Sequence, residues 1–388
     1  MHQTRVVLRD SYRGLTRPGR RLITFAAMVV ATHLTTRRIE AATRPDRDRA
    51  IDALRAIAIL GVVLGHWLVT ALVFDEGRVQ VVSPLQHMQA LTPVSWVFQT
   101  LAVFFLVGGQ VAAGSWSRRA VRYEDWVAHR LKRLFRPVLL VLVVWTVVAG
   151  FLLALGASGE AVGTLVKLVL SPMWFLLVFA ALTAATPLVV RLHPVVPFAV
   201  VVVVDLLRLG LGAPAWVGWI NLAAGWLVPF ALGARWGRMS RRALWALLIG
   251  GVVATVGLVL WAGYPASMVG VPGAGFSNLA PPSLAAVTFG LAQCGLAGLV
   301  REPLRRLMRR PAWWATVVMV NLFAMTIFLW HQTAMITGTV LARTLVGPLT
   351  GLHTTPDSAV WVLARVGWLP LFGLILLFVC LAARRVRG

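Results

Sequence analysis

The amino-acid sequence predicts an all-α integral membrane protein, a bundle of about ten transmembrane helices with both termini in the cytoplasm. Three observations predict this class. Of the 388 residues, 59% are hydrophobic and only 13% are charged, whereas soluble domains average about 25% charged residues. Many of the apolar stretches reach about 18 residues or more, the length that crosses the hydrocarbon core of a bilayer. Basic residues gather in alternate connecting segments, as membrane topology requires.

Residues 1–50 form a basic segment that we expect in the cytoplasm, either disordered or lying along the membrane surface. Its one apolar stretch, from Leu22 to Leu34, follows Arg20 and Arg21 and has features of a signal peptide or a twin-arginine signal. The stretch is short for a membrane span. A span there would also move every later loop to the other side of the membrane and invert the charge pattern. We therefore interpret it as non-spanning.

Ten apolar blocks follow and make up the predicted transmembrane domain, residues 51–383, before a basic cytoplasmic tail, 384–388. With residues 1–50 in the cytoplasm, the connecting segments on that side carry 31 of the 37 Lys and Arg residues. The positive-inside rule is therefore obeyed at every turn. The blocks are 51–74, 94–114, 136–155, 172–190, 194–209, 214–234, 243–263, 279–300, 314–340 and 358–383.

The strong positive charge and the two cysteines bear on which partners the chain binds. A net charge of +24 would suit nucleic-acid binding, but the basic residues stand in short loops that offer no face large enough for a duplex. Cys294 and Cys380 lie within apolar blocks without metal-ligand spacing. The sequence also lacks a Walker loop, a Rossmann fingerprint and a nucleophile elbow. We therefore expect no nucleic-acid partner and no metal.

The first apolar block carries two ionisable residues, Arg55 and His66. They are eleven positions apart, so on a helix they project from nearly the same face, about 16 Å apart along the axis. Ionisable groups inside a bilayer are costly and commonly mark a functional site. Gly61 and Gly65 form a Gly-x-x-x-Gly step that lets a neighbouring helix pack closely. The alternatives are a snorkelling anchor for Arg55 and a His66 ring bonded to a backbone carbonyl.

Four polar residues share a similar predicted depth, roughly 9–14 Å below the outer ends of their helices. They are His66, His331, Arg365 and Asp205. Isolated, each would be costly in the membrane, but in one cavity they could satisfy one another. Our hypothesis is a polar layer in the outer half of the bundle. A competing interpretation pairs Asp205 with Arg208, three residues on, as a local ion pair.

A basic cluster follows the second block and contains Arg130 and Arg133. These two are neighbours on one helical face, and arginine grips phosphate bidentately, which favours a cradle for a phosphorylated ligand. The alternative is a cluster that only sets the topology. Trp174 stands near the outer end of the fourth block, where a Trp is usually an interfacial anchor. Residues 262–282 hold four prolines and predict a shaped loop.

Four stretches stand out together along the ten blocks: Arg49–Arg55 leading to Gly65-His66, Val103–Gly109, Arg130-x-x-Arg133, and Met173–Leu176 with Phe328–His331. In this order they resemble motifs of membrane acyltransferase family 3, a group of O-acyltransferases that modify sugars, glycans and lipid-linked substrates. The resemblance covers about residues 48 to 383. The glycine-rich second stretch is similar to the actinobacterial branch. The chain has Gly108-Gly109-Gln110 where many members have Ser-Gly-Phe, which bears on helix packing.

This resemblance implies a membrane-bound O-acyltransferase that crosses the cell (plasma) membrane many times. Such an enzyme moves an acyl group, acetyl or another short one, from acyl-CoA to a hydroxyl of a carbohydrate, a cell-envelope glycan or a lipid-linked acceptor. The implied partners are acyl-CoA, that acceptor and membrane lipids, with no bound cofactor. A histidine with an ordinary pKa can take the proton of the acceptor hydroxyl, and His331 or Arg365 could donate to the oxyanion; a route through acyl-histidine is also open. The implied roles are catalytic for His66 and His331, donor-binding for Arg55, Arg130 and Arg133, and supporting for Asp205, Arg365 and Trp174.

The main alternative function is a multi-pass transporter or flippase for a lipid-linked sugar or a drug. It too would use intramembrane histidine and arginine. Transporters often have two related halves with interrupted helices, and the sequence shows no matching pair of interrupted spans. A third interpretation is a non-catalytic partner in a cell-envelope complex.

Overall fold

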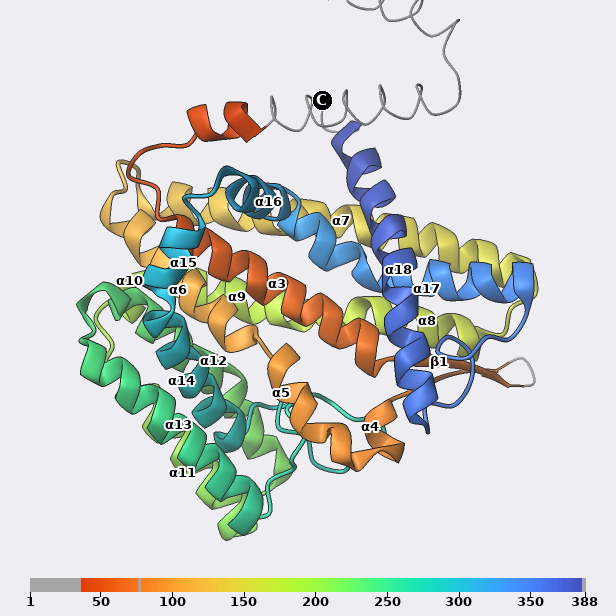
Figure 1. Cartoon of the computed structure of the whole chain (residues 1–388). Coiled ribbons are helices and arrows are strands. Elements are labelled where there is room, and N and C mark those ends of the chain that lie inside the picture. Colours follow the sequence, from red (N-terminus) through yellow and green to blue (C-terminus); the bar gives the residue numbers. More distant parts are fainter. Residues whose placement is uncertain (1–35, 76–77, 386–388) are drawn as a thin grey trace, which may run out of the picture. The chain divides into compact units, whose positions relative to one another are not determined.

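Figure 1 shows the computed structural model of the protein, which describes residues 36–75 and 78–385. These residues form two compact units, one of 36–53 with 302–322 and one of 54–301 with 323–385. The apolar stretch from Leu22 to Leu34 and the end of the basic tail lie outside the described residues.

Helices account for most of the described chain, beginning with α3 (Arg49–Val69), which starts in the smaller unit and continues in the larger one. A two-stranded antiparallel hairpin, β1 (Ala71–Asp75) and β2 (Arg78–Val82), follows it. The other helices are α4 (Pro84–His87), α5 (Ser95–Phe98), α6 (Leu101–Ser117), α7 (Tyr123–Ala154), α8 (Gly159–Leu170), α9 (Trp174–Ala184), α10 (Thr186–Val189), α11 (Val195–Asp205), α12 (Ile220–Arg235), α13 (Arg241–Trp261), α14 (Leu284–Leu299), α15 (Arg301–Leu307), α16 (Pro311–Leu322), α17 (Ala324–Val346) and α18 (Ala359–Arg385).

The predicted membrane class agrees with these helices. Seven helical segments of the described chain are long and apolar enough to cross a bilayer, and two interrupted pairs, α14 with α15 and α16 with α17, raise the number to nine if each pair is one span. The predicted block at 194–209 is not among them, because α11 has only 11 residues before a π-helical turn, Leu206–Gly210. The number ten and the side of each terminus stay predictions.

Three predicted blocks have different bounds in the structure. The first ends at Val69 rather than at 74, because the β-branched residues that follow pair as β1 and β2. The third is part of α7, a 32-residue helix with Pro137 in its interior. The fourth block, predicted to begin at residue 172, begins at Gly159 instead, because the Ser158 side chain caps α8 by accepting from the Ala161 N–H at 3.2 Å.

The smaller unit is organised around Trp314, whose side chain is fully buried with Ala53 and Met308. The Arg49 guanidinium lies 4.9 Å from the centroid of the Trp314 ring and pairs with Glu40 at 2.6 Å. Because a cation over an indole face is attracted by the ring quadrupole, this stack helps fix the first turn of α3.

Glycines set the closest helix contacts of the larger unit. A methyl group added at Gly109 of α6 would overlap the Phe230 carbonyl of α12, and one at Gly233 of α12 would overlap the Leu106 carbonyl of α6. Gly109 therefore brings α6 against α12, whereas its neighbour Gly108 faces the Phe179 ring of α9. Gly251 and Gly295 play the same part between α13 and α14, which lie side by side in Figure 1.

The Gly61 and Gly65 step of α3 also faces a close neighbour. That neighbour is the junction between α5 and α6, where Thr100 meets Gly61 and Phe98 meets Gly65. The Thr100 hydroxyl donates to the Ala58 carbonyl at 2.7 Å. The predicted close approach is therefore present, although it involves a helix break rather than a continuous helix.

The proline-rich segment at 262–282 forms the shaped loop that the sequence predicts. Asn278 is fully buried and donates to the carbonyls of Pro265 at 2.6 Å and Ser267 at 2.9 Å. The Trp96 indole N–H donates to the Ala266 carbonyl at 2.7 Å. The loop is therefore fastened to the segment that precedes α6.

Candidate functional site

The structure brings His66 and His331 together from helices far apart in the sequence. Their ring centroids are 5.1 Å apart and the ring planes are tilted by 48°. His66 lies less than one turn before α3 ends at Val69 and is half-buried. His331 lies in α17 and is only 1% exposed. The Trp67 indole N–H donates to the His331 carbonyl at 2.9 Å, which holds the two helices in this register.

The hydrogen bonds of His331 determine which of its ring nitrogens is free. Nδ1 lies 2.5 Å from the Phe328 carbonyl, and a carbonyl can only accept, so Nδ1 carries a hydrogen. In the neutral ring Nε2 is then an acceptor, and it is buried without a hydrogen-bond partner among the described residues. Buried polar atoms are nearly always satisfied, so this atom is one to which a ligand can bind.

Gln332 is a member of the site that the sequence did not identify. Its Nε2 lies 3.3 Å from Nδ1 of His66, its side chain is 1% exposed, and its Oε1 has no partner within the described chain. Only the cost of burying an amide in a membrane span could have singled it out. His331 and Gln332, adjacent on α17, thus each bring an acceptor atom without a hydrogen-bond partner among the described residues close to His66.

Arg365 of α18 fastens the end of α3 next to His66. Its guanidinium donates to the carbonyls of Trp67 at 2.6 Å, Gly351 at 3.0 Å and Thr70, and to the sulfur of Met335 at 3.0 Å. The Trp67 carbonyl belongs to the last turn of α3, where carbonyls lack intrahelical partners. These bonds use four of the five guanidinium N–H groups, which favours a positioning role for Arg365.

Asp205 belongs to a different cluster, which corrects its expected place in the polar layer. Its carboxylate accepts from the Asn221 amide at 2.8 Å, the Tyr264 hydroxyl at 2.9 Å and the backbone N–H of Leu284 at 2.6 Å. These partners also differ from the ion pair with Arg208. Burial and the Asp205 carboxylate raise the pKa of Tyr264, so this hydroxyl stays a donor. The cluster ties α11, α12 and α14 to the shaped loop.

Trp174 begins α9 and stands in an aromatic group beside the histidines. Its ring centroid is 6.2 Å from that of Trp226. The next residue, Phe175, meets Phe328 edge-on at 4.6 Å, and Phe328 lies 5.8 Å from His331. The predicted supporting residue therefore begins an apolar wall that leads to the catalytic candidates.

The three predicted donor-binding arginines lie away from the histidines, on α3 and α7. Arg55 is half-buried on α3, about 16 Å before His66 along the axis. Arg130 is half-buried over the Trp126 ring at 4.9 Å, and Arg133 is exposed.

Helix α7 also reaches the neighbourhood of the histidines. The Trp145 indole N–H donates to the hydroxyl of Thr333, the residue after Gln332, at 3.0 Å. Trp145 follows Arg133 by about 18 Å along α7. Both α3 and α7 begin towards the left of Figure 1 and end towards the right, so their arginines precede the histidine pair in the same direction.

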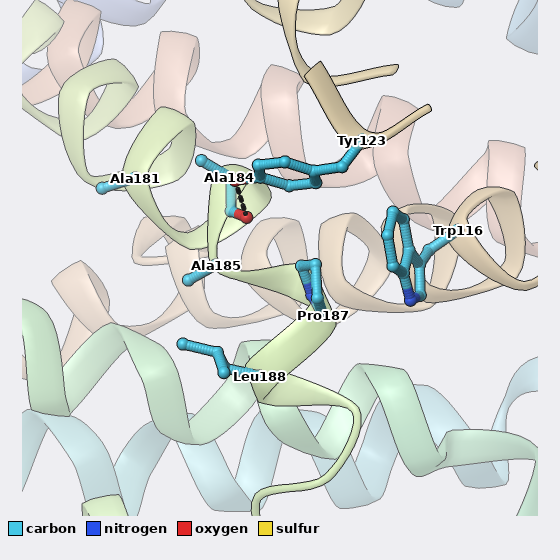
Figure 2. Close-up of a pocket in the computed structure, with 7 residues that line it drawn as sticks. All are labelled: Trp116, Tyr123, Ala181, Ala184, Ala185, Pro187 and Leu188. Atoms are coloured by element: carbon cyan, nitrogen blue, oxygen red, sulfur yellow. Dashed lines mark hydrogen bonds between the residues drawn. The ribbon is translucent and has the colours of Figure 1, made fainter. Parts of the chain in front are cut away.

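A separate hollow of about 510 Å³ lies between the end of α6, the start of α7 and the α9–α10 segment. Figure 2 shows Trp116 and Tyr123 on one side of it and Ala184, Pro187 and Leu188 on the other. The described residues contain no group of three or more His, Cys, Asp or Glu side chains arranged to hold a metal ion.

Comparison with known proteins gives one result. A family model described as an acyltransferase domain matches residues 48–385. No match was found among curated proteins or among solved structures. The matched range contains both histidines, Gln332 and the three arginines.

Proposed function

Since the chain belongs to membrane acyltransferase family 3, we propose that it transfers a short acyl group, such as acetyl, from acyl-CoA to a hydroxyl of a carbohydrate, a cell-envelope glycan or a lipid-linked acceptor. The observation that carries this proposal is the meeting of His66 and His331 beside the amide of Gln332. Membership itself makes the chain an acyltransferase; the donor, the acceptor and the plasma membrane as its location are our proposal.

In the proposed reaction, His66 acts through Nε2. Its Nδ1 faces Gln332, so Nε2 is the nitrogen left for the acceptor hydroxyl. A ring that takes a proton at Nε2 must carry its own hydrogen on Nδ1, and that hydrogen needs an acceptor. The Gln332 amide can turn its oxygen to this position, because the two ends of an amide occupy nearly the same space. Gln332 then acts as a positioning residue.

The transfer proceeds with a simple balance of atoms. The acceptor O–H proton moves to His66 Nε2 while the oxygen attacks the thioester carbonyl. The C–S bond breaks as the new C–O ester bond forms, and the thiolate of coenzyme A leaves with the proton that His66 returns. Neither step needs a metal or a further cofactor.

We propose for His331 a different role from donation to the oxyanion. Because its Nδ1–H is used by Phe328, the neutral ring has only the lone pair of Nε2 to offer, so it accepts a hydrogen bond and does not donate to an oxyanion. A carbohydrate brings several hydroxyl donors, and a second hydroxyl on Nε2 would hold it beside His66. The unsatisfied Nε2 supports a polyhydroxyl acceptor.

The donor is proposed to enter from the end where the arginines lie. Phosphates of acyl-CoA would meet Arg130 and Arg133, with Arg55 further along, because guanidinium groups bind phosphate oxygens in pairs. The aromatic wall that begins at Trp174 offers an apolar surface next to the acyl chain.

No observation favours the transporter. The structure does contain interrupted helix pairs, α14–α15 and α16–α17. These pairs follow one another directly in the chain, however, whereas the interrupted helices of transporters occupy corresponding places in two halves.

The deciding experiment measures thiol release from acetyl-CoA by the purified protein with candidate glycans. We expect His66→Ala to abolish acceptor-dependent thiol release without lowering the thermal stability of the protein. His87→Ala, at an exposed histidine, is the matched control and should retain full activity. Unchanged release by His66→Ala contradicts the proposal, and transport of an unmodified substrate by that variant supports the rival function.

A further inference from the structure

The hollow between α6, α7 and α9–α10 has the character of a binding site for part of an apolar molecule. Its volume of about 510 Å³ lies in the range of small-molecule pockets, about 300–1,000 Å³. Ala181, Ala184 and Leu188 provide one wall, and Trp116 and Tyr123 the other (Figure 2). The Tyr123 hydroxyl donates to the Ala184 carbonyl at 2.9 Å and so ties the two walls together.

Arginines lie around the side of the hollow that Trp116 and Tyr123 form. The Arg119 guanidinium lies 3.2 Å from the centroid of the Trp116 ring. The ring centroids of Trp116 and Trp126 are 5.4 Å apart, and the Arg130 guanidinium lies over the Trp126 ring. Arg118 is exposed in the same turn. A basic rim therefore borders an apolar hollow at the ends of two candidate membrane spans.

The chemistry of the lining decides between two kinds of phosphate-bearing ligand. A nucleotide would place a base with several donors and acceptors in the hollow and needs polar partners there. Two of the lining side chains carry a polar atom: the Tyr123 hydroxyl, whose hydrogen is already donated to Ala184, and the Trp116 indole nitrogen, which can only donate. A hydrocarbon chain needs no such partners. Basic pockets between transmembrane helices are known to hold anionic lipid headgroups.

We propose that this hollow binds an anionic phospholipid. One acyl chain packs against Ala181, Ala184 and Leu188, and the phosphate lies on the rim with Arg118 and Arg119. The hollow shares no residue with the histidine site, and the variants that test it leave Arg130, a proposed donor-binding residue, unchanged.

The test uses the full-length protein in nanodiscs of phosphatidylcholine with a small share of phosphatidylglycerol, followed by native mass spectrometry of the released complex. We expect one phosphatidylglycerol retained per chain, with at least a fivefold preference over phosphatidylcholine. Arg118→Gln with Arg119→Gln should remove the preference, and Ala181→Phe should remove the lipid by filling the hollow. The control is Arg241→Gln with Arg242→Gln, at two exposed arginines that begin α13 away from the hollow.

Three outcomes overturn the proposal: no preference in the wild-type protein, an equal loss in the α13 control, or displacement of the lipid by 3′,5′-ADP, which would assign the hollow to a nucleotide. Thermal stability is recorded for each variant. If Ala181→Phe does not fold, the arginine variant and its control still decide the result.

Discussion

At the scale of single residues, the contact between Gln332 and His66 has the most direct consequence for activity. Gln332→Met keeps the length of the side chain but cannot hold the hydrogen on Nδ1 of His66. We therefore expect kcat to fall about 10- to 100-fold, which is part of the roughly 10²–10⁴-fold rate enhancement that a positioned general base supplies. KM for acyl-CoA should not change. Gln332→Glu, which keeps an oxygen facing His66, should recover part of kcat.

The control for this prediction is the next residue on the same helix. Thr333→Val removes a half-buried hydroxyl that accepts from Trp145 and does not contact His66 through a hydrogen bond. An equal loss of kcat in Thr333→Val and Gln332→Met would reduce the role of Gln332 to packing. The ¹⁵N shifts of the His66 ring offer a second measurement, since a mixture of tautomers is expected only in Gln332→Met.

His353, in the loop between α17 and α18, should make stability depend on pH. The ring is held neutral, because its Nδ1 accepts from the Leu349 N–H at 3.0 Å and its Nε2 donates to the Thr339 carbonyl at 2.8 Å. Burial, and then the charges of Arg343 and Arg365, lower the pKa of His353, while the bond to Thr339 opposes them. Its ordinary value is about 6.5.

The sign of this dependence follows from proton linkage. The unfolded chain binds the His353 proton first, so the stabilisation is complete above about pH 6.5 and is lost as the pH falls through the lower folded value. We expect a lower Tm at pH 5 than at pH 7.5, measured in detergent. In His353→Gln the difference should shrink, whereas in the exposed-residue control His87→Gln it should persist.

At the scale of helices, the glycine contact between α6 and α12 makes a sharp stability prediction. Gly109→Ala forces a methyl group onto the Phe230 carbonyl, which should cost about 1–3 kcal/mol, as overpacking does elsewhere. Gly150→Ala in α7 meets no atom within 4 Å and should stabilise the helix by about 0.5–1 kcal/mol. Thermal unfolding in detergent compares the two variants. A lower Tm in both of them would contradict the packing argument.

The helices also mark how far hydropathy predicts structure. The spans α7, α13 and α18 correspond to long uninterrupted apolar blocks. The predicted end of α3 was wrong, because residues 71–74 continue the apolar run of the helix although they form strand β1. Helix α8 was missed because Glu160 and Lys167 make it resemble a loop, although Ser158 was a cap signal.

The sequence predicted those residues of the candidate site that carry an ionisable side chain. His66, His331 and Arg365 drew attention because ionisable groups are costly in a membrane, and the structure places all three around the end of α3. Gln332 carries no charge and gave no comparable signal. Asp205 was misplaced because depth along a helix does not determine the direction in which a side chain points.

At the scale of the whole chain, the number of membrane crossings determines where the termini lie. Nine spans would leave them on opposite sides, whereas the basic tail and the basic first 50 residues predict the same side. Residues 195–210 would then be the tenth crossing, about 24 Å long, which requires local thinning of the bilayer.

Reporter fusions measure this topology directly. We expect fluorescence from a green fluorescent protein fused at either end and no activity from alkaline phosphatase fused after residue 388. An active phosphatase at that position would establish an odd number of crossings and remove 195–210 from the membrane.

The Arg365 clamp also affects the biogenesis of the protein. The proposed base leaves the ribosome early, on α3, whereas Gln332, His331 and the guanidinium that fastens Trp67 leave it on the last two helices. A chain that stalls or is truncated before α18 would therefore hold the proposed donor-binding arginines without an aligned histidine. We therefore expect the nascent product to hydrolyse no acyl thioester until α18 has been inserted.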